Sequence, residues 1–149
     1  MKKIIVIFQL LFITVLCSSF QYNEEKQCTL TVKVNDLRNS DGLVQFTLYN
    51  TENALPDEEF KKYYRKLCAK VVDESSEVTF KNLPQGKYAV NILHDEDGDG
   101  TIKKGFILPV EGVGFSNYQS IGLSNRPTFN KASFMLNSNK SIEIFIIYM

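Results

Sequence analysis

Short runs of alternating apolar and polar residues recur along the chain, and turn-forming residues separate them. Residues 28–34 (CTLTVKV) alternate with a period of two, and residues 43–49 (LVQFTLY) do so again after the dipeptide Asp41-Gly42. A period of two predicts a strand with one buried face. Because Asp-Gly favours the tight turn of a hairpin, these two runs predict a β-hairpin.

The same pattern returns in the second half of the chain. Residues 77–83 and 87–93 flank the turn 84–86 (PQG), which predicts a second hairpin. Residues 131–136 and 141–148 predict two further strands near the C-terminus. The last run (SIEIFIIY) is mostly apolar, so we expect this strand to be covered on both faces.

Residues 55–67 (LPDEEFKKYYRKL) break the alternation. A proline comes early, acidic residues follow it and basic residues come last, which is the order that a helix favours. The apolar side chains fall at helical spacing, at Phe60, Tyr63, Tyr64 and Leu67. We expect a short crossover helix that caps one end of the fold, with an exposed aromatic patch for a partner as the alternative.

Six to eight short strands, hairpin turns and one short helix are typical of an all-β protein with an antiparallel two-sheet sandwich. The chain of 149 residues is long enough for one domain with a sizeable core, which we place at residues 27–149. Residues 101–127 are glycine-rich and polar without a period. A loop of that length in a compact domain is usually functional or disordered.

The N-terminal segment has the organisation of an export signal. Lys2 and Lys3 precede the apolar run 4–16, and small residues follow at 17–19. The pattern predicts a signal peptide over residues 1–20 and a secreted or periplasmic protein. The apolar run is too short for a membrane span, so no transmembrane segment is expected after its removal.

The cysteines leave two questions open. Cys17 allows a lipid anchor if cleavage occurs just before it, although bacterial lipoproteins usually carry a small residue where this chain has Leu16. Cys28 and Cys68 remain after the signal is removed, and in an oxidising compartment they can pair. A disulfide there closes a loop of roughly 40 residues, worth about 3–4 kcal/mol in the chain-entropy model. The alternative is two separately buried free thiols.

Acidic residues gather directly after the run that ends at Leu93. Asp95, Asp97 and Asp99 occupy every second position, and Gly100 follows. This spacing matches the first half of a calcium-binding loop, in which alternate carboxylates turn toward one cation and glycine permits the bend. Carboxylates so close together repel one another, so a cation among them is favoured electrostatically. The alternative is a solvated acidic turn that binds nothing.

The rest of the calcium shell must come from weaker ligands. Thr101 can offer its backbone carbonyl, and Glu111 in the following loop is our candidate for a further carboxylate. Phe106 stands where an EF-hand has its bidentate glutamate, so we expect weak affinity, with a Kd of about 10⁻⁴–10⁻³ M. His94 is expected to hydrogen-bond the loop backbone instead, because calcium takes oxygen ligands.

The segment after Glu111 has two interpretations. Gly112 and Gly114 would permit a positive φ and a close approach to the acidic loop, which is a structural role. Alternatively, this segment lines a pocket for a small polar ligand, with Ser116, Asn117 and Tyr118 as the binding residues.

The composition favours a binding protein over an enzyme. The 17 basic and 17 acidic side chains balance, so nothing indicates nucleic acid or an anionic membrane as a partner. The sequence contains no G-x-S-x-G, H-E-x-x-H or P-loop motif and a single histidine, so we assign no catalytic residue. We expect a secreted module, stabilised by Ca²⁺, that binds an envelope protein or glycan. The alternative is a small metal-assisted hydrolase or accessory enzyme that uses Glu111 beside the acidic loop.

Several segments together resemble a known family. Residues 78–90 (VTFKNLPQGKYAV) resemble the hairpin of prealbumin-like and collagen-adhesin B-type sandwich modules. Combined with residues 94–100, 109–117 and 126–129, they resemble the bacterial secreted family of domain of unknown function 2141, over about residues 30–147. The resemblance implies a secreted or periplasmic β-sandwich of the prealbumin-like or Ig-like kind, with no established activity.

The chain departs from that family's pattern at the acidic loop. The family often carries asparagines in the loop and a further acid near the position of Lys103. By this comparison a fourth loop ligand is missing here, which leaves Glu111 as the candidate to replace it.

Overall fold

A computed structural model describes residues 26–103, 109–122 and 124–149 of the chain. The predicted signal peptide over residues 1–20, and with it Cys17, lies outside the described residues. No helix within the described residues has the length and apolar character needed to cross a membrane.

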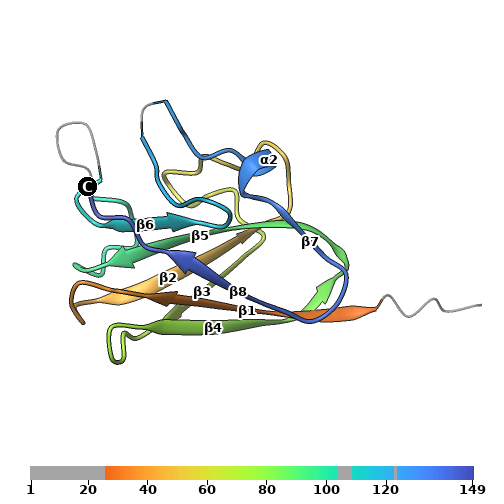
Figure 1. The fold of residues 1–149 in the computed structure, drawn as a ribbon, viewed down its shortest axis with the longest axis horizontal. Coiled ribbons are helices and arrows are strands. Elements are labelled where there is room, and N and C mark those ends of the chain that lie inside the picture. Colours follow the sequence, from red (N-terminus) through yellow and green to blue (C-terminus); the bar gives the residue numbers. More distant parts are fainter. Residues whose placement is uncertain (1–25, 104–108, 123) are drawn as a thin grey trace, which may run out of the picture.

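Two β-sheets pack face to face, as the alternating pattern predicts (Figure 1). The first sheet has the order β4-β1-β8, from Ser76–Pro84, Gln27–Asn35 and Lys140–Phe145. The second has the order β3-β2-β5-β6, from Arg65–Ala69, Leu43–Tyr49, Gly86–Asp95 and Gly112–Phe115, and β7 (Phe134–Leu136) pairs with the start of β5. The prediction of an all-β two-sheet sandwich is confirmed. Both predicted hairpins are wrong, because β1 and β2 lie in different sheets, as do β4 and β5, and each of these connections crosses between the layers.

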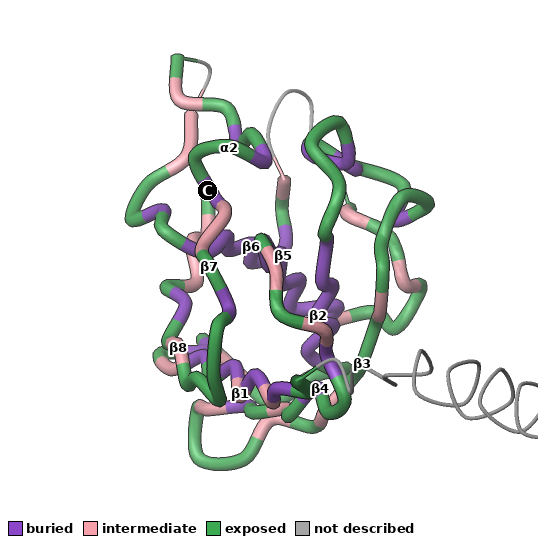
Figure 2. The backbone as a smooth tube through the Cα atoms, turned by 90° about the vertical axis from the view of Figure 1, so that its right-hand side faces the viewer, coloured by how far each residue is buried: buried purple, intermediate pink, exposed green. Residues whose placement is uncertain are grey.

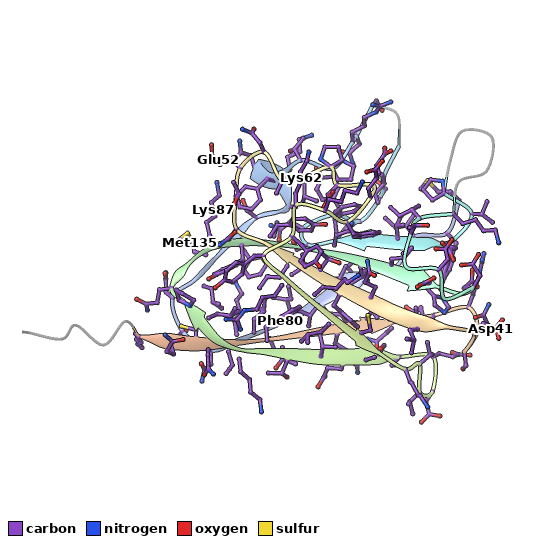
Figure 3. All side chains as sticks on the ribbon, turned by 180° about the vertical axis from the view of Figure 1, so that it is seen from behind. Asp41, Glu52, Lys62, Phe80, Lys87 and Met135 are labelled. Carbon is purple, nitrogen blue, oxygen red and sulfur yellow. The ribbon has the colours of Figure 1, made fainter. Side chains whose placement is uncertain are left out.

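The core lies between the sheets because every second residue of the facing strands points inward. Leu30, Val32 and Val34 of β1 are fully buried and meet Phe46 and Ile92 of the second sheet. Phe80 of β4 fills the same layer (Figure 3). Figure 2 shows the buried residues gathered along the central strands of both sheets.

The outer face of the second sheet is buried as well. Loops cover it, and a second apolar cluster forms there around Tyr49, Ala89, Phe115 and Phe129. For this reason β5 is buried on both faces from Tyr88 to Asp95. β5 is therefore covered on both sides, and so is β2 from Val44 to Tyr49.

The expected helix over residues 55–67 is wrong. The first part is an irregular loop in which the Asp57 carboxylate accepts hydrogen bonds from the backbone N–H groups of Lys61 and Lys62. The second part becomes β3, which pairs antiparallel with β2. Pairing with a neighbouring strand outweighs the local helical pattern here. The structure forms a short helix elsewhere, α2 (Phe129–Ala132), which Thr128 caps.

Two expectations near the C-terminus are also wrong. The last strand, β8, is an edge strand that pairs parallel to β1, so the sandwich is not antiparallel throughout and this strand is not covered on both faces. Phe145 in β8 is 55% exposed. The segment 101–127, expected to be a loop throughout, contributes β6 to the second sheet.

The predicted disulfide is wrong, because both thiols are free. Cys28 lies in β1 of the first sheet, in the core between the layers. Cys68 lies in β3 of the second sheet and is exposed. It pairs with Gln45, on the opposite face from the core residue Phe46, so its side chain points away from Cys28.

Gly42 directly precedes β2, whose first residue pairs with Asp95 at the start of the acidic loop. Its φ is +61°, and an added Cβ would lie 1.8 Å from the Asp95 carbonyl oxygen. We expect Gly42→Ala to lower the free energy of unfolding by about 2–4 kcal/mol, measured by urea denaturation. The control is Gly98→Ala, where φ is +74° but no atom lies within 4 Å, and we expect a loss of about 1 kcal/mol. Equal losses in the two variants would contradict the close-approach argument.

Candidate metal site in the acidic loop

The acidic loop begins at Asp95, where β5 ends, and lies at one end of the second sheet. Its three aspartates come together. One carboxylate oxygen from each of Asp95, Asp97 and Asp99 lies within 4.8 Å of the other two. Calcium binds oxygens at about 2.3–2.6 Å, so ligands around one ion stand at most about 5 Å apart. The spacing of the three aspartates therefore fits one calcium ion.

The loop is folded by its own carboxylates. Asp95 is buried and accepts hydrogen bonds from the backbone N–H groups of Asp99 (3.1 Å) and Gly100 (2.9 Å). Asp99 accepts from the backbone N–H of Thr101 (2.7 Å) and from its hydroxyl (2.8 Å). Gly98 and Gly100 supply the positive φ values that this tight path requires. The same hydrogen bonds serve a solvated turn and a preformed cation site.

Lys103 brings a positive charge to the cluster. Its ammonium lies 2.8 Å from the Asp97 carboxylate. This ion pair holds the pKa of the Asp97 carboxyl below its ordinary value, chiefly through the hydrogen bond from Lys103, and raises the pKa of Lys103 in return. From the sequence, position 103 was considered only as the place of a missing acid. Its lysine, six residues after Asp97, in fact serves as a counter-ion within the loop.

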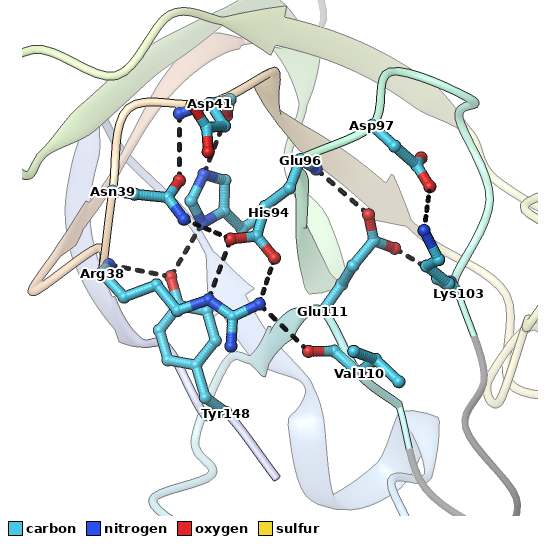
Figure 4. Close-up of polar contacts among 10 residues, drawn as sticks. All are labelled: Arg38, Asn39, Asp41, His94, Glu96, Asp97, Lys103, Val110, Glu111 and Tyr148. Carbon is cyan, nitrogen blue, oxygen red and sulfur yellow. Dashed lines mark hydrogen bonds and ion pairs between the residues drawn. The ribbon is translucent and has the colours of Figure 1, made fainter.

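Glu111 lies beneath the loop and holds both ends of it (Figure 4). It is 2% exposed. One carboxylate oxygen accepts from the backbone N–H of Glu96 at 3.1 Å, and the other accepts from the backbone N–H of Lys103 at 2.9 Å. The carboxylate oxygens that converge belong to Asp95, Asp97 and Asp99 and not to Glu111. Both oxygens of Glu111 already accept backbone N–H groups. A role as a fourth calcium ligand stays a prediction, as does the use of the Thr101 carbonyl.

A network on the other side of the loop was missed by the sequence analysis. The Arg38 guanidinium forms an ion pair with Glu96 and donates to the carbonyl oxygen of Val110 at 3.2 Å. It also lies over the Tyr148 ring, 4.5 Å from its centroid. These residues are far apart in the sequence, so no local spacing points to them. The Arg38 hydrogen bonds hold the pKa of the Glu96 carboxyl below its ordinary value, against the opposing effect of burial.

His94 is buried within the same network, and its two ring nitrogens contact groups other than the loop carboxylates (Figure 4). Its Nε2 lies 3.1 Å from the carbonyl oxygen of Asp41, and its Nδ1 lies 2.8 Å from the Tyr148 hydroxyl. A carbonyl can only accept, so we assign the proton to Nε2, and Nδ1 then accepts from Tyr148. The backbone that it binds belongs to the β1–β2 loop and not to the acidic loop.

The segment after Glu111 serves mainly to join parts of the fold. Ser116 is buried, accepts from the Val90 backbone N–H at 2.9 Å and donates to the Ala132 carbonyl at 2.7 Å. Asn117 donates its amide to carbonyl groups at the end of α2, including that of Ser133 at 2.9 Å. Tyr118 is buried and donates its hydroxyl to the Arg126 carbonyl. Asn117 and Tyr118 also border a depression of about 240 Å³ beside β8, and ligand binding there stays a prediction.

The expected role of Gly112 and Gly114 needs correction. Neither has a positive φ, and the atoms that an added Cβ would meet at either position belong to the C-terminal segment and to β5, not to the acidic loop. A Cβ on Gly112 would lie 2.5 Å from the Tyr148 ring, and one on Gly114 would lie 2.5 Å from the Phe145 carbonyl oxygen. These glycines allow the C-terminal segment to cross closely over β6.

Comparison with known protein families identifies the family of this chain. A family model described as an uncharacterized protein conserved in bacteria (DUF2141) matches residues 32–144. The chain belongs to the DUF2141 family. This match confirms the expected resemblance, and its bounds contain the acidic loop, Glu111 and Arg38. No curated protein and no solved structure matches the chain.

Removing the charge of Glu111 tests how the DUF2141 loop is held. In Glu111→Gln an amide replaces one of two oxygens that accept backbone N–H groups, so one buried donor loses its partner. We expect the free energy of unfolding to fall by about 2 kcal/mol in urea denaturation. Glu77→Gln, at an exposed site on β4, is the matched control, and its effect should stay within about 0.5 kcal/mol. A Glu111→Gln variant as stable as the control would contradict the anchoring role.

The Arg38–Glu96 pair predicts a dependence on pH. The folded state lowers the pKa of Glu96 from its ordinary value of 4.5, so its stabilising effect is complete above that pH and is lost as the pH falls through the lower folded value. We therefore expect Arg38→Gln to be less stable than the natural protein at pH 7, with the difference shrinking below about pH 4.5. Thermal melts at several pH values measure it, with Lys26→Gln as control. A difference that stays constant down to pH 2 would contradict the pairing.

Proposed function

We propose that this protein is an exported, non-catalytic β-sandwich module of the bacterial envelope that binds another envelope component and whose acidic loop is stabilised by calcium. The observation that carries the calcium part is the gathering of three aspartate oxygens within 4.8 Å. Export rests on the charged and apolar pattern of residues 1–20. The family itself carries no assigned activity.

The environment of the two best candidates for acid–base chemistry favours a binding role. Both ring nitrogens of His94 have partners within the fold. Both oxygens of Glu111 accept backbone N–H groups, which stabilises the carboxylate as a structural anchor and leaves it poorly placed to take a proton from water. A metal-assisted hydrolase that uses Glu111 is therefore the less favoured proposal.

Calcium should compete with Lys103 for the acidic loop. The ammonium engages Asp97, one of the three cation ligands that we propose, so a bound ion must displace it or share the carboxylate. Lys103→Met removes the competing charge and keeps the aliphatic chain. Calcium affinity should then rise, by about three- to tenfold for the loss of one exposed charge near the site.

Thermal melts test the calcium proposal. With a Kd of about 1 mM, 10 mM calcium adds about 1.4 kcal/mol, which corresponds to a rise of about 3–6 °C in Tm relative to protein in chelator. Asp97→Asn should abolish most of that rise, while Glu77→Asn should keep it. Identical midpoints in 10 mM calcium and in chelator would refute the calcium proposal. Any hydrolytic activity that Asp97→Asn abolishes would favour the enzyme alternative.

A further inference from the structure

One surface outside the acidic loop concentrates positive charge. Residues 61–70 (KKYYRKLCAK) contain five basic side chains, and no acidic residue occurs between Glu59 and Asp73. They form β3 and the segment that leads into it, at the edge of the second sheet. Lys62 marks the start of this segment in Figure 3. We refer to residues 62–70 as the β3 strip.

Two cations of the β3 strip, Arg65 and Lys66, are held by hydrogen bonds that do not neutralise them. Arg65 donates to the carbonyl oxygens of Lys81 (2.5 Å) and Asn82 (3.1 Å), and Lys66 donates to the side-chain oxygen of Gln45 (3.2 Å). All of these acceptors are uncharged. Lys61, just outside the strip, forms an ion pair with Glu59, but no ion pair joins the strip to a carboxylate within the described residues. The strip therefore presents uncompensated positive charge.

Aromatic rings lie among these cations. Tyr63 is 41% exposed and Tyr64 is 38% exposed, and Leu67 beside them is 39% exposed. Tyr64 packs against Tyr88 with 6.2 Å between ring centroids. Lys66 Nζ lies 5.7 Å from the Tyr63 ring, and Arg65 Cζ lies 5.3 Å from the Tyr64 ring. Tyr64 is thus packed against the protein on one side, and both rings keep accessible surface.

Protection of a sheet edge explains part of this surface. Lysines on an edge strand discourage another strand from pairing with it. The half-exposed tyrosines just before this strand and Leu67 on it have the opposite effect, because apolar surface on an edge invites association. Edge protection therefore does not account for the aromatic residues.

We propose that the β3 strip binds a linear acidic polysaccharide. Carboxylates along such a chain pair with the lysines and arginine, and the tyrosines offer surfaces on which sugar rings stack. Lys66 lies on β3 and Lys70 directly follows its end, four residues on, which is about 13 Å at 3.3 Å per residue, so a polymer charged on every ring reaches both. An anionic bilayer fits less well, because the Tyr64 ring packs against Tyr88 and is not free to insert. This proposal rests on the proposed binding role and is independent of calcium.

Binding to polygalacturonate tests the proposal, with the uncharged polymer dextran as the reference. Calorimetric titration of the full mature protein at low salt should show binding to polygalacturonate and none to dextran, and the affinity should fall as salt is added. The double variant Lys66→Glu/Lys70→Glu should weaken binding about tenfold or more. Lys26→Glu/Lys131→Glu changes the charge equally at exposed sites elsewhere and should bind within about twofold of the natural protein.

Two further variants keep the test decisive. If the charge-reversed protein fails to fold, Lys66→Gln/Lys70→Gln replaces it, and its thermal midpoint verifies the fold. Tyr63→Ala should weaken polygalacturonate binding with little change in its salt dependence, because it removes stacking and leaves the charges. Titrations with polyglutamate and with anionic vesicles test other partners.

The outcomes separate the claims. No binding to polygalacturonate, equal loss in both double variants, or tighter binding to polyglutamate or vesicles overturns the polysaccharide proposal. A calcium-dependent rise in Tm in the same preparation would leave the calcium-stabilised module standing. If calcium does not raise the Tm but polygalacturonate still binds, the calcium proposal is overturned and the proposal of polysaccharide binding by the β3 strip stands.

Discussion

Burial of β5 on both faces is the constraint on which the other features depend. One face meets the core between the sheets, and the other needs a cover that the first sheet cannot provide. The chain supplies this cover with irregular segments, which the Asp57 carboxylate, Ser116 and Asn117 tie down by hydrogen bonds to the backbone. Where β5 emerges from between these layers, its last residue begins the acidic loop. The position of the acidic loop in the fold is therefore set by the packing of β5, while the loop's own carboxylates set its local path.

The acidic loop illustrates how a buried carboxylate can organise an exposed one. Glu111 holds the backbone at Glu96 and at Lys103, so the segment between them begins and ends at fixed points. Within that frame, Asp95 and Asp99 shape the turn through backbone N–H groups, and Lys103 offsets part of their repulsion. Arg38 secures Glu96 from the other side. A loop with this support keeps its aspartates close despite their like charges.

Local patterns predicted the strands within residues 27–49 and 76–95 and the gathering of the aspartates, because both depend on residues close together in the sequence. The two predicted hairpins were wrong, because each short connection, at Asp41-Gly42 and at Gln85, crosses from one sheet to the other and does not pair the strands that it joins. The helix at residues 55–67 was wrong because apolar residues at helical spacing can also be divided between a covering loop and an edge strand. Phe60 is buried in the loop, and Leu67 lies on the edge strand. The parallel pairing of β8 with β1 could not be predicted, since no turn between them fixes a register. Neither could the meeting of Arg38, Glu96 and Tyr148, which depends on three distant segments. The balanced total charge likewise concealed its separation into an acidic loop and a basic edge.

The C-terminal segment has a mechanical consequence. After β8 leaves the first sheet, Ile147 exchanges two backbone hydrogen bonds with Val113 of the second sheet, at 2.9 and 2.8 Å. Tyr148 then reaches His94. Residues 147 and 148 therefore join the first sheet to the second, so the two sheets cannot separate one after the other while these hydrogen bonds remain. Loss of these hydrogen bonds and separation of the sheets then occur together, and the domain is expected to unfold cooperatively as one unit.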